Sequence, residues 1–527
     1  MARRGDGAPA ERPAGALLFV HGIGFQPAGA TLTEFSDLLV AFLGEHAGGL
    51  TVSPVAEGGT AAISRREYRM AYTDAEGRAQ ERRILLAEAH WADVFLHPHR
   101  LALVRWLFDV MSGFVLFHLG ATFFGRVRDA ALDVRRAVEA RRPGAVARAA
   151  LRFARVALAG QLAAVSRYVM VVLGGVLLLL VLPVSLVPAV HRRLQKFFDD
   201  TVGDSYVAVT NPVQFRRITR TVKRAVDECL VACGPTGRVT VVAHSQGAMI
   251  GQTVLAARRY GDRVSLVGLG SGLGPLHALR HGLQKTRLSL ALGAMIVMEV
   301  FLAGALAVST WPFLVALGSL PAVVAAAAEA ARAGGPAQVR DTMTGATAPL
   351  RDAWGAQDHA FVLIGVASVA GLVMARLARS GGLTTLIEGW TRSLAMPPGA
   401  VREWVEFSSR YDPVSCGPLL ETAASRVYDV VNGPGLLTQH TGYKENPLVL
   451  LELTTRLGEA LGTTLISDEE SRAVAEAAER AARRHRLVLG ATVLLGWLLA
   501  AGTLAVAFLW WSGVVDRWLG LPPGWVF

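Results

Sequence analysis

Short apolar runs bounded by turn residues recur along the chain and predict buried strands. Residues 16–20, 239–243 and 264–269 are apolar segments of strand length, and the second is rich in β-branched side chains. Residues 404–408 and 426–431 predict two further strands. Helical patterns lie between several of these runs. Strands that alternate with helices in this order predict a doubly wound α/β sheet.

Two helices and one hairpin are predicted around these strands. Residues 31–43 have the pattern of an amphipathic helix, with Thr31 or Thr33 as its cap. Residues 74–77 predict the turn of a β-hairpin. The pair Asn211-Pro212 suits the cap and first turn of a second helix. The residues expected on its buried face are Ile218, Val222, Val226 and Cys229, and those on its other face are Arg216, Arg217, Arg220, Lys223 and Arg224.

Long apolar runs of a different kind predict membrane spans. The run 168–190 is the strongest, because it has no charged residue and is flanked by arginines. The run 487–511 follows a basic cluster and ends in a tryptophan pair, which is typical of the bilayer interface. The remaining candidates are residues 106–124, 288–308, 311–328 and 359–375. We therefore expect transmembrane helices in addition to the sheet.

Composition supports this interpretation. The hydrophobic fraction is 52% and the mean hydropathy is +0.38, which is high for a soluble enzyme. The net charge of +11, without a nucleic-acid-binding motif, favours contact with an anionic lipid leaflet over DNA or RNA. Cys229, Cys233 and Cys416 offer no disulfide framework, and residues 1–13 lack an apolar signal core. We expect an integral protein of the cell membrane whose globular part is cytoplasmic.

Residues 243–247, with the sequence AHSQG, carry the candidate chemistry. They follow a predicted strand and open a helix predicted over 248–259. A serine at a tight strand-to-helix turn needs small residues two positions before and after it, and Ala243 and Gly247 meet this need. Such a turn exposes the hydroxyl at the carboxyl end of the sheet, beside the positive end of the helix dipole. The pattern predicts Ser245 as a nucleophile.

A serine nucleophile needs a base, and the base needs an acid to orient it. Asp412 follows one predicted strand, and His440 lies in a loop past the next, which gives the chain order Ser, Asp, His. Asp262 and Asp429 compete for the acid role, but the first precedes a strand and the second lies within one. The alternative bases are His277, His281 and His359.

These motifs resemble those of the α/β-hydrolase superfamily of lipases and esterases, over about half of the chain. Residues 243–247 are similar to its nucleophile elbow, with Ala243 where the pattern usually has glycine. The resemblance implies an oxyanion hole built from the backbone amides of Gln246 and of Ile23 or Gly24. It implies no cofactor. The other residues that it identifies in the oxyanion loop and the elbow are His21, Gly22, His244 and Gly247.

A triad that assembles on one side of a bilayer requires an even number of spans between its members. This requirement excludes the proline-broken run 311–328 and leaves two hairpins and a C-terminal span. We therefore predict a doubly wound α/β-hydrolase sheet interrupted by transmembrane helical hairpins and followed by a transmembrane helix. The predicted boundaries place the hydrolase core in 1–100, 196–280 and 396–455, the membrane insertions in 101–195 and 281–395, and the C-terminal helix with its span in 456–527.

Two clusters have simpler interpretations than a functional site. His90, Asp93, His97 and His99 are potential metal ligands, but their spacing matches no standard zinc pattern. We expect them to cap a strand and border the membrane, and we expect no metal. Cys229 and Cys233 lie one helical turn apart and are expected to be buried core thiols.

The leading hypothesis from the sequence is a membrane-bound serine hydrolase that cleaves an acyl ester of a lipid-like substrate through an acyl-enzyme. Its expected partners are the lipid bilayer and that substrate, and not a nucleic acid. An acyltransferase with the same triad is the first alternative. A non-catalytic membrane scaffold on a hydrolase fold is the second.

Overall fold

The computed structural model describes residues 12–22, 27–60, 63–74, 77–92, 133–134, 136–140, 144–153, 211–274, 276–277, 325, 329, 332, 394–412, 414–415 and 425–511. The chain divides into two compact units. The first comprises Met1–Arg126, Val171–His281 and Gly389–Leu495 and contains all the side chains discussed below. The second comprises Val127–Met170, Gly282–Glu388 and Gly496–Phe527.

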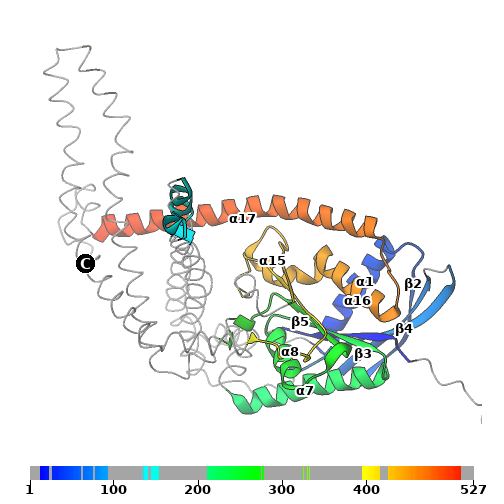
Figure 1. Cartoon of the computed structure of the whole chain (residues 1–527). Helices are drawn as coiled ribbons and strands as arrows, with labels where there is room; N and C mark the ends of the chain where they lie inside the picture. Colours follow the sequence, from blue (N-terminus) through cyan, green and yellow to red (C-terminus); the bar gives the residue numbers. More distant parts are fainter. Residues whose placement is uncertain are drawn as a thin grey trace, which may run out of the picture. The chain divides into compact units, whose positions relative to one another are not determined.

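An eight-stranded sheet with the strand order β2-β3-β4-β1-β5-β6-β7-β8 forms the centre of the first unit (Figure 1). β3 pairs antiparallel with β2 and β4, whereas the other neighbouring strands pair in parallel. The strands are β1 (Gly15–Val20), β2 (Thr51–Thr60), β3 (Ile63–Thr73), β4 (Ala79–Ala89), β5 (Arg238–His244), β6 (Val264–Leu269), β7 (Trp404–Ser408) and β8 (Arg426–Asp429).

Burial on both faces explains why these strands were recognisable in the sequence. Every residue of β1, β6 and β7 is buried, which is typical of parallel strands with helices on both sides. The five predicted strands correspond to β1, β5, β6, β7 and β8, so the sheet is compatible with the predicted α/β class. The predicted hairpin is also present, because β3 and β4 pair from Thr73 and Ala79 onward.

Helices cover both faces of the sheet, so that alternate residues of β1 belong to two different cores (Figure 1). Leu18 packs in the core that includes α7 and α8, whereas Leu17 and Phe19 pack in the core that includes α1 and α16. The helices are α1 (Ala30–His46), α7 (Pro212–Ala232), α8 (Gln246–Ala257), α15 (Leu436–Thr441), α16 (Pro447–Leu461) and α17 (Asp468–Trp511).

The two predicted helix caps have different outcomes. Asn211 caps α7 as predicted, since its side chain accepts hydrogen bonds from the amides of Val213 and Gln214, both at 3.1 Å. The prediction of Thr31 or Thr33 as the cap of α1 is wrong. Gly29, in a left-handed conformation, precedes that helix, and the Leu32 amide donates instead to Glu88 Oε2 in β4 at 2.9 Å.

The transmembrane part of the predicted fold class is contradicted. Among the residues that the structure describes, no helix has both the length and the apolar character needed to cross a bilayer. The predicted span 487–511 lies within α17, where Leu489 is fully buried and packs in one cluster with Val431 and Ala482. Leu489 thus contacts protein, whereas Leu487 and Val488 are exposed. The predicted spans outside the described residues are 106–124, 168–190, 288–308 and 359–375.

Candidate active site

Ser245 occupies a strained turn between β5 and α8. Its backbone has φ 55° and ψ −122°, and it is the one non-glycine residue with positive φ in the described part of the chain. Two backbone hydrogen bonds hold this conformation: the Ser245 amide donates to the Leu269 carbonyl at 2.9 Å, and the Gly272 amide donates to the Ser245 carbonyl at 3.1 Å. The loop after β6 therefore fixes the turn.

Close backbone approach explains two glycines around the serine. A Cβ on Gly247 would lie 2.4 Å from the carbonyl oxygen of His21 and 2.5 Å from that of Val20. A Cβ on Gly22 would lie 2.9 Å from the Cβ of Ser245. The first turn of α8 can thus pack against the end of β1 only without side chains at these positions.

Three residues far apart in the sequence form one hydrogen-bonded chain. His440 Nε2 lies 2.9 Å from Ser245 Oγ, and His440 Nδ1 lies 3.0 Å from both carboxylate oxygens of Asp412. Ser245 and Asp412 are buried, and the His440 side chain is 15% exposed. The structure brings together the three residues that the sequence singled out, with the imidazole between the hydroxyl and the carboxylate.

The Asp412 carboxylate is held in its ionised form. It accepts hydrogen bonds from the Tyr443 hydroxyl at 2.9 Å and from the amides of Val414 and Ser415 at 2.7 and 3.2 Å. Burial raises the pKa of Asp412, but the hydrogen bond and charge of His440, together with the two amides, outweigh burial and lower this pKa below its usual value. An ionised acid at this position orients the imidazole and stabilises its protonated form.

His440 lies in a short helix and not in the predicted loop. It belongs to α15, and the side chain of the preceding residue, Gln439, is fully buried. Gln439 Oε1 accepts hydrogen bonds from Ser409 Oγ at 2.9 Å and from the Asn432 amide at 3.1 Å. This buried amide therefore ties α15 to the segments that follow β7 and β8, which determines where the imidazole lies.

His244 connects the nucleophile turn to the base. Its Nε2–H donates to the His440 backbone carbonyl at 2.8 Å, and the two rings lie 4.9 Å apart. Shielding from water and then the neighbouring His440 lower the pKa of His244 to about 4. His244 is thus neutral at neutral pH and serves as a hydrogen-bond donor that positions His440.

The oxyanion-hole residues are described only in part. Gln246 is the first residue of α8, so its amide lies at the amino end of that helix, where backbone donors face outward. Ile23 and Gly24 lie outside the described residues. Gly22 lies against Ser245 of the elbow, whereas the His21 ring stacks on Trp91 with centroids 4.6 Å apart.

The alternative candidates for the acid and the base are not part of this hydrogen-bonded chain in the described residues. Asp429 forms an ion pair with Arg410 at the end of β8. Asp262 lies in a single 3-10 turn, Gly261–Arg263, before β6 and therefore at the amino end of that strand. His277 is buried. The alternatives His281 and His359 lie outside the described residues, as do Asp93, His97, His99 and Cys416.

Two buried side chains near the site, Tyr443 and Glu406, were not predicted from the sequence. Tyr443 follows His440 by three residues, and its hydroxyl lies between the Asp412 carboxylate and the Ser409 amide, 2.8 Å from the latter nitrogen. Glu406 in β7 is fully buried and bonds to Ser271 and to Trp404 Nε1. Tyr443 could have been inferred from its position one helical turn after the base. The sequence around Glu406 gives no indication that its carboxylate bonds to Ser271.

No protein-family model, curated protein or solved structure matches this chain. The geometry of the site alone supports a function. A buried carboxylate, an imidazole and a serine hydroxyl in series can activate the hydroxyl for attack on an electrophilic carbonyl carbon.

Proposed function

We propose that this chain is a serine hydrolase of the α/β-hydrolase type, which cleaves an acyl ester. The observation that carries the proposal is the series of contacts from Ser245 Oγ through the His440 imidazole to Asp412, at 2.9 and 3.0 Å. The strained turn of Ser245 adds support, because a serine between a strand and a helix is presented to substrate in this way.

Acylation starts with proton transfer. His440 Nε2 removes the proton from Ser245 Oγ as the oxygen attacks the ester carbonyl carbon, which gives a tetrahedral intermediate. The imidazolium that forms lies against the ionised Asp412. His440 then gives the proton to the leaving alkoxide oxygen, the carbon–oxygen bond of the ester breaks, and the acyl group remains on Ser245.

Deacylation repeats these steps with water as the nucleophile. His440 Nε2 takes a proton from water, the hydroxide adds to the acyl carbon, and Ser245 leaves with the proton returned by the imidazolium. The Gln246 amide at the start of α8 is the described donor that we assign to the oxyanion. A single donor of this kind contributes about 100- to 1,000-fold in kcat.

The proposal concerns the ester bond and not the identity of the acyl group. A lipid-like substrate was expected from the predicted membrane hairpins, which lie outside the described residues. Hydrolysis and acyl transfer share the acyl-enzyme and differ only in the acceptor. Product analysis of a p-nitrophenyl ester with and without added glycerol separates them, because an acyltransferase yields the glycerol ester in place of free acid.

Labelling with a fluorophosphonate probe tests the nucleophile. The full chain should be labelled once, Ser245→Ala should not be labelled, and Ser36→Ala should be labelled like the wild type. Ser36 is a matched control because it is a fully buried serine, located in α1. Equal labelling of Ser245→Ala and the wild type would refute the assignment, and a wild type without labelling or esterase turnover would favour a non-catalytic scaffold.

A further inference from the structure

A second cluster of chemically capable side chains lies beside the proposed active site. His21, Glu88 and His90 come together so that one potential ligand atom from each lies within 4.8 Å of the others. Their exposures are 1%, 0% and 3%, so the cluster is closed to bulk water. The serine chemistry uses none of these three side chains.

The sheet determines why these residues meet. β1 and β4 are parallel neighbours with Val20 opposite Ala89, so His21 and His90 follow at the same level of two adjacent strands. Glu88 and His90 are two residues apart along β4 and its extension, which places them on the same face of the sheet. In the sequence, His90 lies near Asp93, His97 and His99, whereas the fold places it beside His21 and Glu88.

The Glu88 carboxylate has one satisfied oxygen and one without a partner. Oε2 accepts the Leu32 amide in the first turn of α1 at 2.9 Å. Oε1 is buried and has no hydrogen-bond donor in the described part of the chain; His90 Nδ1 is 3.7 Å away. A buried carboxylate oxygen without a donor is costly, and a cation is the natural partner for it.

The contacts of His21 select one tautomer. Its Nδ1–H donates to the Gly22 carbonyl at 2.9 Å, and its Nε2 faces the Trp91 amide at 3.3 Å. The first contact requires the proton on Nδ1, and the second requires a lone pair on Nε2. An imidazole that donates to a backbone carbonyl through one nitrogen and presents a lone pair on the other is the usual form of a metal-bound histidine.

We propose that His21, Glu88 and His90 bind a divalent transition metal ion, with Zn²⁺ as the best match. Two imidazoles and one carboxylate, with water as the fourth ligand, are a common zinc donor set. The Leu32 amide and the Gly22 carbonyl supply the outer hydrogen bonds that orient such ligands. Binding would draw the ligand atoms to about 3.3 Å from one another, as tetrahedral coordination at about 2.0–2.1 Å requires. It would also replace the long contact between Nε2 and the Trp91 amide.

The ion would have a structural role. It would join the carboxyl ends of β1 and β4 and fix His21, the residue before Gly22. Because Gly22 lies against Ser245, the ion would also fix one wall of the nucleophile turn. The inference does not depend on the proposed hydrolysis, since it concerns side chains outside the triad.

Metal binding to the full chain tests the inference. Protein stripped with a chelator should bind one Zn²⁺ in competition with a chromogenic chelator, and Co²⁺ should give the intense visible bands of a tetrahedral site. Glu88→Gln and His90→Asn should each lower Zn²⁺ affinity by at least 100-fold. His46→Asn is the matched control, because His46 pairs with Glu470 at 2.7 Å in a partly exposed His–Glu pair, and it should bind like the wild type.

Two results would overturn the proposal. The first is a wild type that binds no more than a trace of Zn²⁺ or gives only octahedral Co²⁺ bands, a measurement that needs no variant to fold. The second is a Co²⁺ spectrum with thiolate charge transfer, which would place the ion at Cys229 and Cys233. Ser245→Ala should bind Zn²⁺ like the wild type, so the failure of the hydrolase proposal and that of the metal proposal are distinguishable.

Discussion

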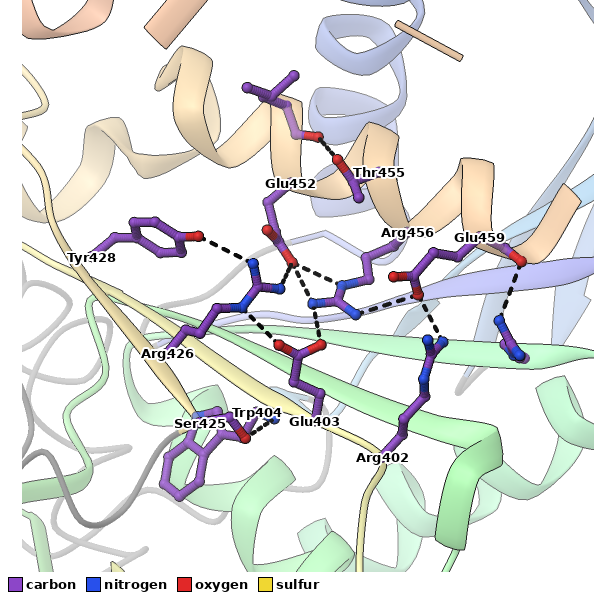
Figure 2. Close-up of polar contacts among 12 residues, drawn as sticks. Arg402, Glu403, Trp404, Ser425, Arg426, Tyr428, Glu452, Thr455, Arg456 and Glu459 are labelled. Carbon is purple, nitrogen blue, oxygen red and sulfur yellow. Dashed lines mark hydrogen bonds and ion pairs between the residues drawn. The ribbon is translucent and has the colours of Figure 1, made fainter. Parts of the chain in front are cut away.

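The two ends of β7 and β8 organise charge in opposite ways. At their amino ends, carboxylates and guanidinium groups form a network between the strands and α16 (Figure 2). Arg456 is at its centre: its side chain is 1% exposed and contacts Glu403 at 2.8 Å and Glu459 at 3.4 Å. The other members of the network are Arg402, Arg426 and Glu452.

Beyond the carboxyl ends of the same strands, one acid faces an imidazole and not a guanidinium group. Asp412 is paired with His440, and Ser245 lies on the other side of the ring. At the amino end, the carboxylates pair with guanidinium groups, which carry a permanent charge. The comparison teaches that buried charge stabilises the fold at one end and is available for chemistry at the other.

The largest change in activity is expected from substitution of Asp412, beyond the carboxyl ends of β7 and β8. Asp412→Asn should lower kcat for a p-nitrophenyl ester by about 10,000-fold, because a neutral amide selects the wrong imidazole tautomer and cannot stabilise the imidazolium. The free energy of unfolding in urea should change far less. A variant that keeps wild-type turnover would show that Asp412 is not the acid of the triad.

At the amino ends of β7 and β8, a substitution should lower stability and leave activity nearly unchanged. Arg456→Met should lower the free energy of unfolding by about 3–5 kcal/mol, because Glu403 and Glu452 lose a buried cation. Activity per folded molecule should stay within about twofold, since the ends of a strand are separated by its length. The double variant Arg456→Met/Glu452→Leu should recover part of the stability, and the lack of any recovery would contradict this account.

Glu403 and Glu406 are three residues apart, yet their pKa values shift in opposite directions. Burial without a cation raises the pKa of Glu406 to about 7, whereas Arg456 and Arg426 outweigh burial and lower the pKa of Glu403. Because the folded-state pKa of Glu406 exceeds its unfolded value, its contribution to stability is present below about pH 4.5 and is lost as the pH rises through 7.

Urea unfolding between pH 5 and pH 8 measures this contribution. The wild type should lose on the order of 2–3 kcal/mol of stability over this range relative to Glu406→Gln, which has no titrating group at that position. Asp412 should change the stability in the opposite direction. Because its pKa is lowered in the folded state, the free energy of unfolding falls as the pH drops through the usual pKa range of an aspartate. Parallel pH profiles for the wild type and Glu406→Gln would disprove the assignment.

The smallest expected effect concerns the positioning of the base. His244→Ala removes the donor to the His440 carbonyl and should lower kcat by about 10- to 100-fold through misplacement of the imidazole. KM should change little. His244→Gln can keep a donor near the same place and should restore part of the rate, whereas equal losses in both variants would argue against a positioning role.

The buried strands and the nucleophile turn were predictable because their signals are local. The apolar runs around Leu17, Val241 and Val405 each identify a strand without reference to any other segment. Burial on both faces requires such runs, and a serine at a strand-to-helix turn requires Ala243 and Gly247. The transmembrane prediction depended on apolar runs alone, and an apolar side chain in such a run can also be buried against protein, as Leu489 is.

The sequence alone determined which residues carry nucleophile, acid and base character and in what order the chain presents them. Only the tertiary structure decided that Ser245, Asp412 and His440 share one hydrogen-bonded chain, that Tyr443 and Gln439 support it, and that Glu88 meets two histidines. The physical reason is that strand runs and turns depend on neighbouring residues, whereas these contacts depend on sheet register and on how segments up to 195 residues apart pack together.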